Sequence, residues 1–206
     1  MVCASEALER LRNGNRRFVS GERNGEALVT GQRRRELLLD QAPFAIVLGC
    51  SDSRAPAEIL FDQGLGDLFV IRVAGNIVAP SQVGSVEFAA EQFGTRLVVV
   101  LGHSSCGVVT VTLDELEQPE EARSPNLRSI VDRIRPSVEG LMDPALGLGR
   151  ETLMRQAVRA NIRTSAHQLR HGSVILEQLI EHHDLVVVGA EYSLATGEVD
   201  FFDGLP

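Results

Sequence analysis

Two short apolar runs that end in glycine and lead into polar clusters constrain this chain most strongly. Residues 44–49 precede the sequence Cys50-Ser-Asp-Ser-Arg54, and residues 97–102 precede His103-Ser-Ser-Cys106-Gly107. Apolar runs of this length are typical of buried strands in a parallel sheet. Ligands bind beyond the carboxyl ends of such strands. We therefore expect the two clusters to meet at one point if the two strands are neighbours.

The two clusters contain a set of side chains that suits zinc. Cys50, His103 and Cys106 offer two thiolates and one imidazole, and Asp52 offers a carboxylate. Thiolate and imidazole ligands select zinc over magnesium or calcium, which prefer oxygen. We predict one Zn²⁺ per chain, held by Cys50, His103 and Cys106. One coordination position is left for Asp52 or for water.

The same residues also have plainer interpretations. Cys50 and Cys106 are consistent with buried structural thiols, since free cysteine is among the most buried residue types. A disulfide between them is disfavoured in a reducing compartment, and an iron–sulfur cluster normally uses four cysteines. Asp52 and Arg54 taken alone are consistent with a surface ion pair of little energetic value. The His-x-x-Cys spacing at a predicted strand end favours the metal site.

Composition excludes several classes of partner. The 206 residues, 44% of them hydrophobic, suffice for one well-cored domain and are few for two. A net charge of −8 argues against a nucleic-acid partner. No apolar run approaches the roughly 20 residues that span a bilayer, and the first residues show no secretory signal. Three cysteines do not make a disulfide framework. We expect a cytoplasmic protein with no membrane partner.

Helical and strand patterns alternate along the chain. Expected helices cover residues 5–20, 32–39, 56–61, 82–93, 127–135, 151–169 and 176–180, and one more begins after residue 107. Expected strands cover residues 44–49, 68–72, 97–102, 185–189 and 199–202, and residues 115–125 are expected to form a surface loop. The alternation predicts a single α/β domain of residues 1–206, with a mainly parallel central sheet flanked by helices. Residues 1–40 would form an amino-terminal helical arm, and residues 41–206 the α/β zinc-binding core.

The chain resembles the β-class carbonic anhydrases of bacteria, zinc enzymes that hydrate CO2. The motifs C-x-D-x-R and H-x-x-C-G carry the resemblance, together with residues 11–18, 61–72, 74–76, 188–192 and 196–197. It implies reversible hydration of CO2 to bicarbonate and a proton by attack of zinc hydroxide. It also implies catalytic roles for Asp52 and Arg54. Arg54 would hold Asp52 away from zinc, and Asp52 would orient the hydroxide; in a closed state, Asp52 would be the fourth ligand.

The resemblance assigns substrate roles to three more residues. Gln41 occupies the position that hydrogen-bonds substrate, often across a subunit boundary, although a helix-end residue is the plainer interpretation. Gly107 would present its amide to bicarbonate, as helix starts bind anions, or would simply open a helix. Phe88 would line the apolar pocket or belong to the core. The resemblance further implies a homodimer or a higher assembly, with the amino-terminal helices extending onto a partner subunit.

One departure from the family pattern affects a regulatory site. Some bacterial members hold a regulatory bicarbonate with a tryptophan, an arginine and a tyrosine. Arg72 and Tyr192 are available for two of these roles, but Val47 stands at the tryptophan position.

Two other functions remain open for this sequence. One is hydrolysis of CS2 or COS on the same zinc site, and the other is a non-catalytic zinc or redox-responsive binding module.

Overall fold

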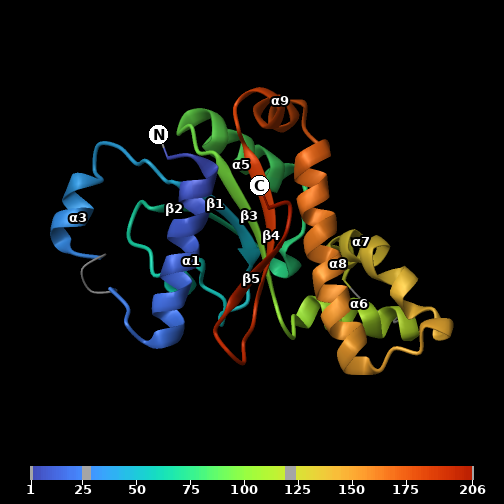
Figure 1. Cartoon of the computed structure of the whole chain (residues 1–206). Coiled ribbons are helices and arrows are strands. Elements are labelled where there is room, and N and C mark those ends of the chain that lie inside the picture. The colour runs from blue at the N-terminus through green and yellow to red at the C-terminus, as the bar shows by residue number, and fades with distance from the viewer. Residues whose placement is uncertain (1, 25–28, 119–123, 206) are drawn as a thin grey trace.

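The computed structural model describes residues 2–24, 29–118 and 124–205, which fold around one central sheet (Figure 1). The sheet has five strands in the order β2-β1-β3-β4-β5. These are β1 (Ala45–Cys50), β2 (Leu68–Val73), β3 (Leu97–His103), β4 (Val186–Tyr192) and β5 (Val199–Asp203). The pairs of β1 with β2, β1 with β3, and β3 with β4 are parallel, and β5 runs antiparallel to β4. The prediction of a mainly parallel sheet is confirmed.

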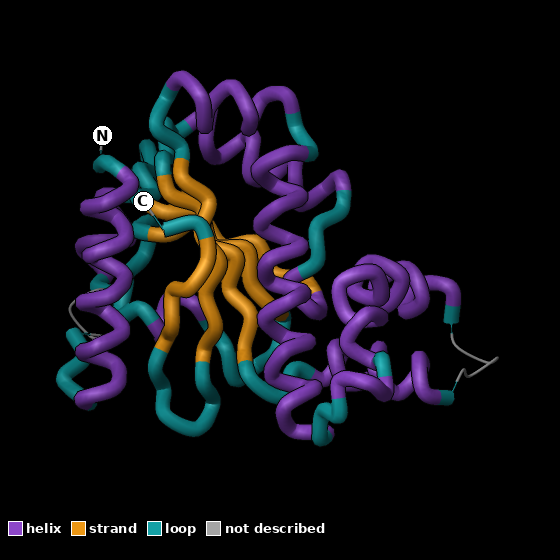
Figure 2. Tube along the Cα trace, turned by 45° about the vertical axis from the view of Figure 1, so that its right-hand side comes forward, coloured by secondary structure: helices purple, strands orange, loops and turns teal. Residues whose placement is uncertain are grey.

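Helices pack against both faces of this sheet (Figure 2). The hydrophobic cluster on one face contains residues of α5 (Pro80–Gln92), α6 (Gly107–Glu117), α7 (Pro125–Val138), α8 (Arg150–His171) and α9 (Val174–His182); the cluster on the other face contains residues of α1 (Ala4–Ser20) and α4 (Ala57–Leu60). Successive side chains of a strand point to opposite faces. In β1, Ile46 and Leu48 therefore pack on the first side, and Ala45 and Val47 on the second. Burial of both faces explains why β1 is apolar along its whole length and β3 is apolar up to His103.

Helix α1 belongs to the hydrophobic core of the chain. Its buried apolar residues are Ala4, Ala7, Leu8 and Leu11. A Cβ atom at Gly14 would lie 1.7 Å from the carbonyl oxygen of Phe61, so only glycine allows α1 to approach this closely. Arg17 donates a hydrogen bond of 2.6 Å to Asp62, whose side chain is fully buried. Extension of the amino-terminal helices onto a partner stays a prediction.

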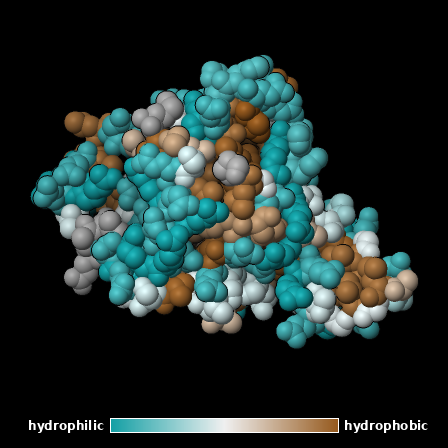
Figure 3. All heavy atoms as spheres, in the orientation of Figure 1, coloured by the Kyte–Doolittle hydropathy of each residue, from teal (hydrophilic) through white to brown (hydrophobic). Residues whose placement is uncertain are grey.

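The second amino-terminal helix is shorter than expected. The helix predicted at residues 32–39 is α3 (Gly31–Glu36), and a turn follows it. Leu38 and Leu39 in this turn are 77% and 97% exposed within the described chain. A longer helix would need an apolar face packed against the core, and these two side chains are not packed in that way. Figure 3 shows apolar atoms at the surface beside α3.

The predicted loop at residues 115–125 is wrong in its first part. Helix α6 continues to Glu117, and Glu115 is buried. The Glu115 carboxylate accepts a hydrogen bond of 3.0 Å from Arg135 of α7, so an acidic residue lies inside the structure and not on a surface loop. Residues 119–123 of the predicted loop lie outside the described residues.

Three of the connections contain short helical turns. They are η1 (Ala74–Asn76), η2 (Glu139–Met142) and η3 (Pro144–Leu146). Strand β4 extends to Tyr192, beyond the predicted end at residue 189, so Tyr192 pairs with His103 of β3. None of the helices in the described part of the chain has both the length and the apolar character required to cross a membrane.

Candidate metal centre

The two polar clusters follow neighbouring strands, which is the condition under which the sequence predicts that they meet. Strand β1 pairs with β3 from Ile46 opposite Val98 to Gly49 opposite Leu101. The chain passes from β1 to β2 on one side and then to β3 on the other, so the direction of strand addition reverses between β1 and β3. In open α/β sheets, ligand sites form beyond the strand ends at such a reversal.

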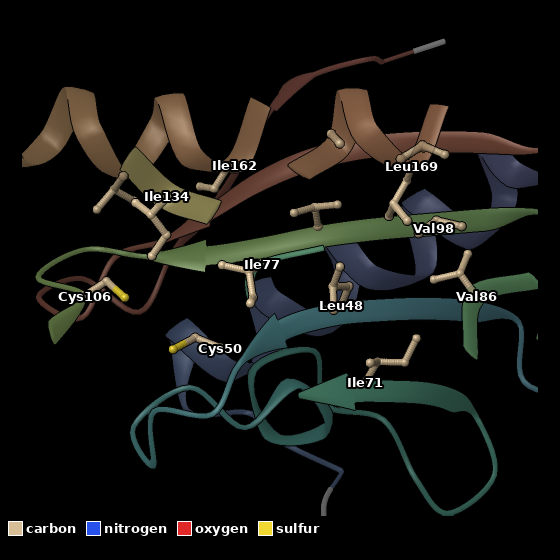
Figure 4. Packing of buried hydrophobic residues seen from close by; sticks show 14 of the residues in the cluster. Leu48, Cys50, Ile71, Ile77, Val86, Val98, Cys106, Ile134, Ile162 and Leu169 are labelled. Carbon is tan, nitrogen blue, oxygen red and sulfur yellow. The ribbon is translucent and has the colours of Figure 1, made fainter. Parts of the chain in front are cut away.

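Three potential metal ligands converge at this reversal. Cys50 is the last residue of β1, His103 is the last residue of β3, and Cys106 immediately precedes α6. Figure 4 shows the sulfur atoms of Cys50 and Cys106 beyond the strand ends, directed into the same gap. The ligand atoms of the three residues all lie within 4.8 Å of one another, and all three side chains are buried. A single metal ion can contact all three.

The local contacts of His103 leave one ring nitrogen available for a metal. Its Nδ1 atom lies 3.0 Å from the carbonyl oxygen of Ser104. A carbonyl only accepts hydrogen bonds, so Nδ1 carries the proton of the neutral ring and Nε2 carries the lone pair. Nε2 is buried and has no hydrogen-bond partner among the described residues. A backbone carbonyl that orients the ring from the other side is typical of histidines that bind metals.

A hydrogen bond between the side chains of Cys50 and Cys106 shifts their pKa values in opposite directions. Cys106 hydrogen-bonds to the sulfur of Cys50 and lowers the pKa of Cys50 to about 4, against the opposing effect of burial. The pKa of Cys106 is raised, because its hydrogen bond to Cys50 and its burial both favour the protonated form. At neutral pH the pair therefore holds one negative charge and one proton. A divalent cation displaces that proton, since a coordinating thiol is deprotonated, and this charge and donor set fit zinc.

Backbone amides stabilise the charge on Cys50. The amides of Gly75 and Asp52 each lie 3.4 Å from its sulfur. Gly75 has φ of 74°, and a Cβ atom there would lie 2.9 Å from the side chain of Ile134, so the position favours glycine. Asn161 of α8 donates a hydrogen bond of 2.8 Å to the carbonyl of Gly75. We did not predict roles for Gly75 or Asn161. The local signals were a glycine two residues after β2 and the place of residues 74–76 among the segments that carry the family resemblance.

Arg54 holds the Asp52 carboxylate beside the three ligands. Its Nε and Nη2 atoms donate hydrogen bonds of 2.9 and 2.8 Å to Oδ1 and Oδ2 of Asp52, and its backbone amide donates a third to Oδ1. These bonds hold the pKa of Asp52 well below its usual range. Oδ2 of Asp52 lies 3.7 Å from Nε2 of His103. The carboxylate is therefore next to the metal centre but is engaged by Arg54.

Gln41 and Phe88 lie near the opposite end of the sheet from the ligands of their own subunit. Gln41 precedes β1, whose length of about 16 Å separates the start of the strand from Cys50. Gln41 lines a groove of about 640 Å³ with Leu38 and Leu39. The ring of Phe88 contacts the ring of Phe69, the second residue of β2. Phe88 as a whole residue is 53% exposed. The structure does not bring either side chain to its own metal centre.

Gly107 lies directly beside the metal centre. It is the first residue of α6 and follows Cys106. A Cβ atom added to Gly107 would meet nothing within 4 Å, so packing within the described chain does not require glycine here. The start of a helix presents free backbone amides, which suits an anion.

The chain is similar to known carbonic anhydrases along most of its length. A family model described as carbonic anhydrase matches residues 45–199. The carbonic anhydrase of Mycolicibacterium smegmatis is 39% identical over 94% of this chain and 91% of that protein. Carbonic anhydrase 2 of Mycobacterium tuberculosis is 38% identical over 93% of this chain and 89% of that protein.

Solved structures share the same fold. The β-carbonic anhydrase CcaA superposes with a TM-score of 0.78 at 27% identity, over 96% of this chain and 95% of that chain. The β-carbonic anhydrase CafA of Aspergillus fumigatus superposes with a TM-score of 0.75 at 21% identity, over 98% of this chain and 91% of that chain. On the family match, the sequence identities and the Cys-His-Cys cluster at the sheet reversal, this chain belongs to the β-class carbonic anhydrase family.

Proposed function

We propose that this protein catalyses the reversible hydration of CO2 to bicarbonate and a proton, at a zinc ion held by Cys50, His103 and Cys106. The observation that carries the proposal is the convergence of these three ligand atoms within 4.8 Å, beside the Asp52–Arg54 pair. The relatives at 38–39% identity that are named carbonic anhydrases support it.

The side chains around the centre have complementary roles in this reaction. Zinc held by two thiolates and one imidazole would supply a Lewis acid that lowers the pKa of water to about 7. Asp52 presents Oδ2 on the side of the His103 ring where Nε2 lies, so this oxygen would accept a hydrogen bond from water at the centre. Arg54 keeps the carboxylate ionised and fixes its direction through two side-chain hydrogen bonds. The amide of Gly107, at the start of α6, would bind bicarbonate.

Gln41 and Phe88 would serve the centre of a second subunit, because each lies far from its own. The exposed side chains of Leu38 and Leu39 adjoin Gln41, and β2 leaves one edge of the sheet unpaired in the described chain. Exposed apolar residues beside an open strand edge are typical of a surface that another chain covers. A solved structure with this fold, at a TM-score of 0.73, is from work on two tetrameric β-carbonic anhydrases of Sordaria macrospora. We propose a homodimer or an assembly of dimers.

A stopped-flow assay with a pH indicator tests the reaction. The zinc-loaded protein should accelerate CO2 hydration, and a Cys106→Ala variant prepared in parallel should not. Turnover of CS2 or COS without CO2 hydration would replace the proposal with a hydrolase on the same site. Turnover of none of these substrates, with release of zinc on oxidation, would indicate a binding module.

A further inference from the structure

Arg72 connects the edge strand β2 to the loop that carries Cys50 and Asp52. Its Nε atom donates a hydrogen bond of 3.1 Å to the carbonyl oxygen of Cys50, and its Nη2 atom donates one of 2.7 Å to the carbonyl oxygen of Asp52. Arg72 lies opposite Gly49 in the pairing of β2 with β1, directly beside the end of β1. Both acceptors are neutral carbonyl oxygens, so this guanidinium holds backbone and not an acidic side chain.

These two bonds determine how the loop is attached to the sheet. The carbonyl of Asp52 also accepts a bond of 3.1 Å from the amide of Ala55, which closes a turn within the loop. The amide of Ser51 donates a bond of 3.2 Å to the carbonyl of Val73. Arg72 is thus the side chain that ties both ends of the segment from Cys50 to Asp52 to β2. With both carbonyls held, the direction in which Asp52 leaves the backbone is also held.

Arg54 alone cannot provide this attachment. Arg54 belongs to the same turn as Asp52 and would move together with it, and its side chain is 55% exposed. Oδ2 of Asp52 already lies 3.7 Å from Nε2 of His103, so a small rotation of the turn would bring the carboxylate onto the metal. A restraint that opposes this rotation has to come from another element. Arg72 provides it from the neighbouring strand.

We propose that Arg72 is a positioning residue that holds the turn from Cys50 to Asp52 in the conformation in which Asp52 stays paired with Arg54 and off the metal. The inference deepens the proposed function and rests on it. A purely stabilising role is the alternative, since Arg72 also satisfies two carbonyls. Arg96 provides the matched control, because its Nη1 atom donates to the carbonyls of Ala90 and Thr95 at the amino-terminal side of β3.

The test compares Arg72→Ala, Arg72→Lys and Arg96→Ala with the unchanged protein, all loaded with zinc. Crystal structures at about pH 7.5 show whether an Asp52 oxygen contacts the metal. Water at zinc begins to ionise in this pH range. Zinc content, kcat and KM for CO2 are measured on the same preparations. Lysine keeps the positive charge but lacks the planar fork that reaches two acceptors.

We expect Arg72→Ala to keep its zinc, to place Asp52 on the metal and to lower kcat about tenfold, the scale of a lost charge-assisted hydrogen bond, with KM unchanged. Arg72→Lys should behave in the same way, and Arg96→Ala should leave the zinc contacts and kcat as they are. Three results would overturn the role of Arg72. Asp52 could stay paired with Arg54 in Arg72→Ala, or Arg72→Lys could have the zinc contacts and kcat of the unchanged protein. Arg96→Ala could also move Asp52 onto zinc and lower kcat as Arg72→Ala does. Should Arg72→Ala not fold, Arg72→Lys provides the same comparison.

The structural measurement separates this inference from the proposed function. If the unchanged protein does not hydrate CO2 but Asp52 still moves onto zinc in Arg72→Ala, the proposed function fails and the positioning role stands. If the unchanged protein hydrates CO2 and Asp52 does not move, the positioning role fails alone.

Discussion

Oδ2 of Asp52 lies 3.7 Å from Nε2 of His103, while both oxygens of the same carboxylate accept hydrogen bonds from Arg54. This geometry places one carboxylate between two possible partners, a metal ion at the His103 nitrogen and the guanidinium of Arg54. Four protein ligands would close a zinc site in the manner of structural zinc sites, and three leave one position for water. We therefore propose that the Asp52–Arg54 pair decides between a closed centre and an open one.

Removal of one thiolate should empty the centre of metal. Protein purified without added zinc should contain about one zinc per chain, and Cys106→Ala should lose most of it, because one of three protein ligands is gone. Elemental analysis by mass spectrometry measures this. Cys3→Ala is the control, since Cys3 is exposed and precedes α1. Full zinc content in Cys106→Ala would remove Cys106 from the ligand set.

Removal of the guanidinium should inactivate the centre without emptying it. In Arg54→Ala, the Asp52 carboxylate loses its partner and becomes free to bind the metal, so zinc should stay and most of the CO2 hydration activity should disappear. Stopped-flow activity and zinc content on one preparation test both parts. Arg150→Ala removes an arginine that pairs with Asp114 and Glu117 at an exposed site and should leave both quantities unchanged. An active Arg54→Ala variant would contradict the role given to Arg54.

Activity should rise between about pH 7 and pH 8.5, the range in which water at zinc ionises. Asp52 does not produce this rise. Its pKa is lowered by the Arg54 hydrogen bonds, so the carboxylate stays ionised at every pH above its ordinary value of about 3.9 and regains its proton only in stronger acid. The pH dependence of kcat, measured by stopped flow at constant ionic strength, tests this. A flat profile together with an Asp52 oxygen on zinc near pH 8 would rule out the open centre.

Two variants that are each impaired should regain activity when they form a mixed dimer, if Gln41 of one chain acts at the metal centre of the other. Gln41→Ala and Cys106→Ala are each expected to be impaired. In a mixed dimer, the intact ligands of one chain meet the intact Gln41 of the other. With random exchange, half of the dimers are mixed and each has one good site, so about one quarter of the original activity should return.

The measurement is CO2 hydration after the two variants are unfolded and refolded together, compared with the same variants refolded separately. Activity equal to the sum of the separate samples would show that Gln41 does not act across a subunit boundary. A monomeric mass with full activity in the unchanged protein would contradict the proposed assembly itself.

Replacement of Gly14 should destabilise the fold. The new Cβ atom in Gly14→Ala would lie 1.7 Å from the carbonyl of Phe61, so α1 must move away from the core, at a cost of about 1–3 kcal/mol in the free energy of unfolding. Gly84→Ala in α5 is the matched control. A Cβ atom there meets nothing within 4 Å, and alanine in a helix should stabilise by about 0.5–1 kcal/mol. Urea unfolding of both variants measures the difference; equal stability would contradict the close packing of α1.

The three candidate ligands could be chosen from the sequence, because thiolate and imidazole chemistry depends on residue type. Cys50 and His103 each follow an apolar run, Cys106 lies three residues after His103, and strand ends at one edge of a parallel sheet bring such residues together. The sheet itself was also predictable, since strands buried on both faces are apolar throughout. Boundaries were less predictable. Glu115 is acidic and resembles a loop residue, yet Arg135 of another helix satisfies it inside the structure.

The tertiary structure alone decided what surrounds the ligands. Arg72 binds the carbonyl of Cys50, the amide of Gly75 binds the sulfur of Cys50, and Asn161 binds the carbonyl of Gly75. These bonds join residues that are 22, 25 and 86 positions apart in the chain. A local pattern cannot contain them, because each depends on the relative placement of two strands or of a helix and a turn. Chemistry that resides in a side chain is visible in the sequence, whereas a contact exists only once packing has brought its two partners together.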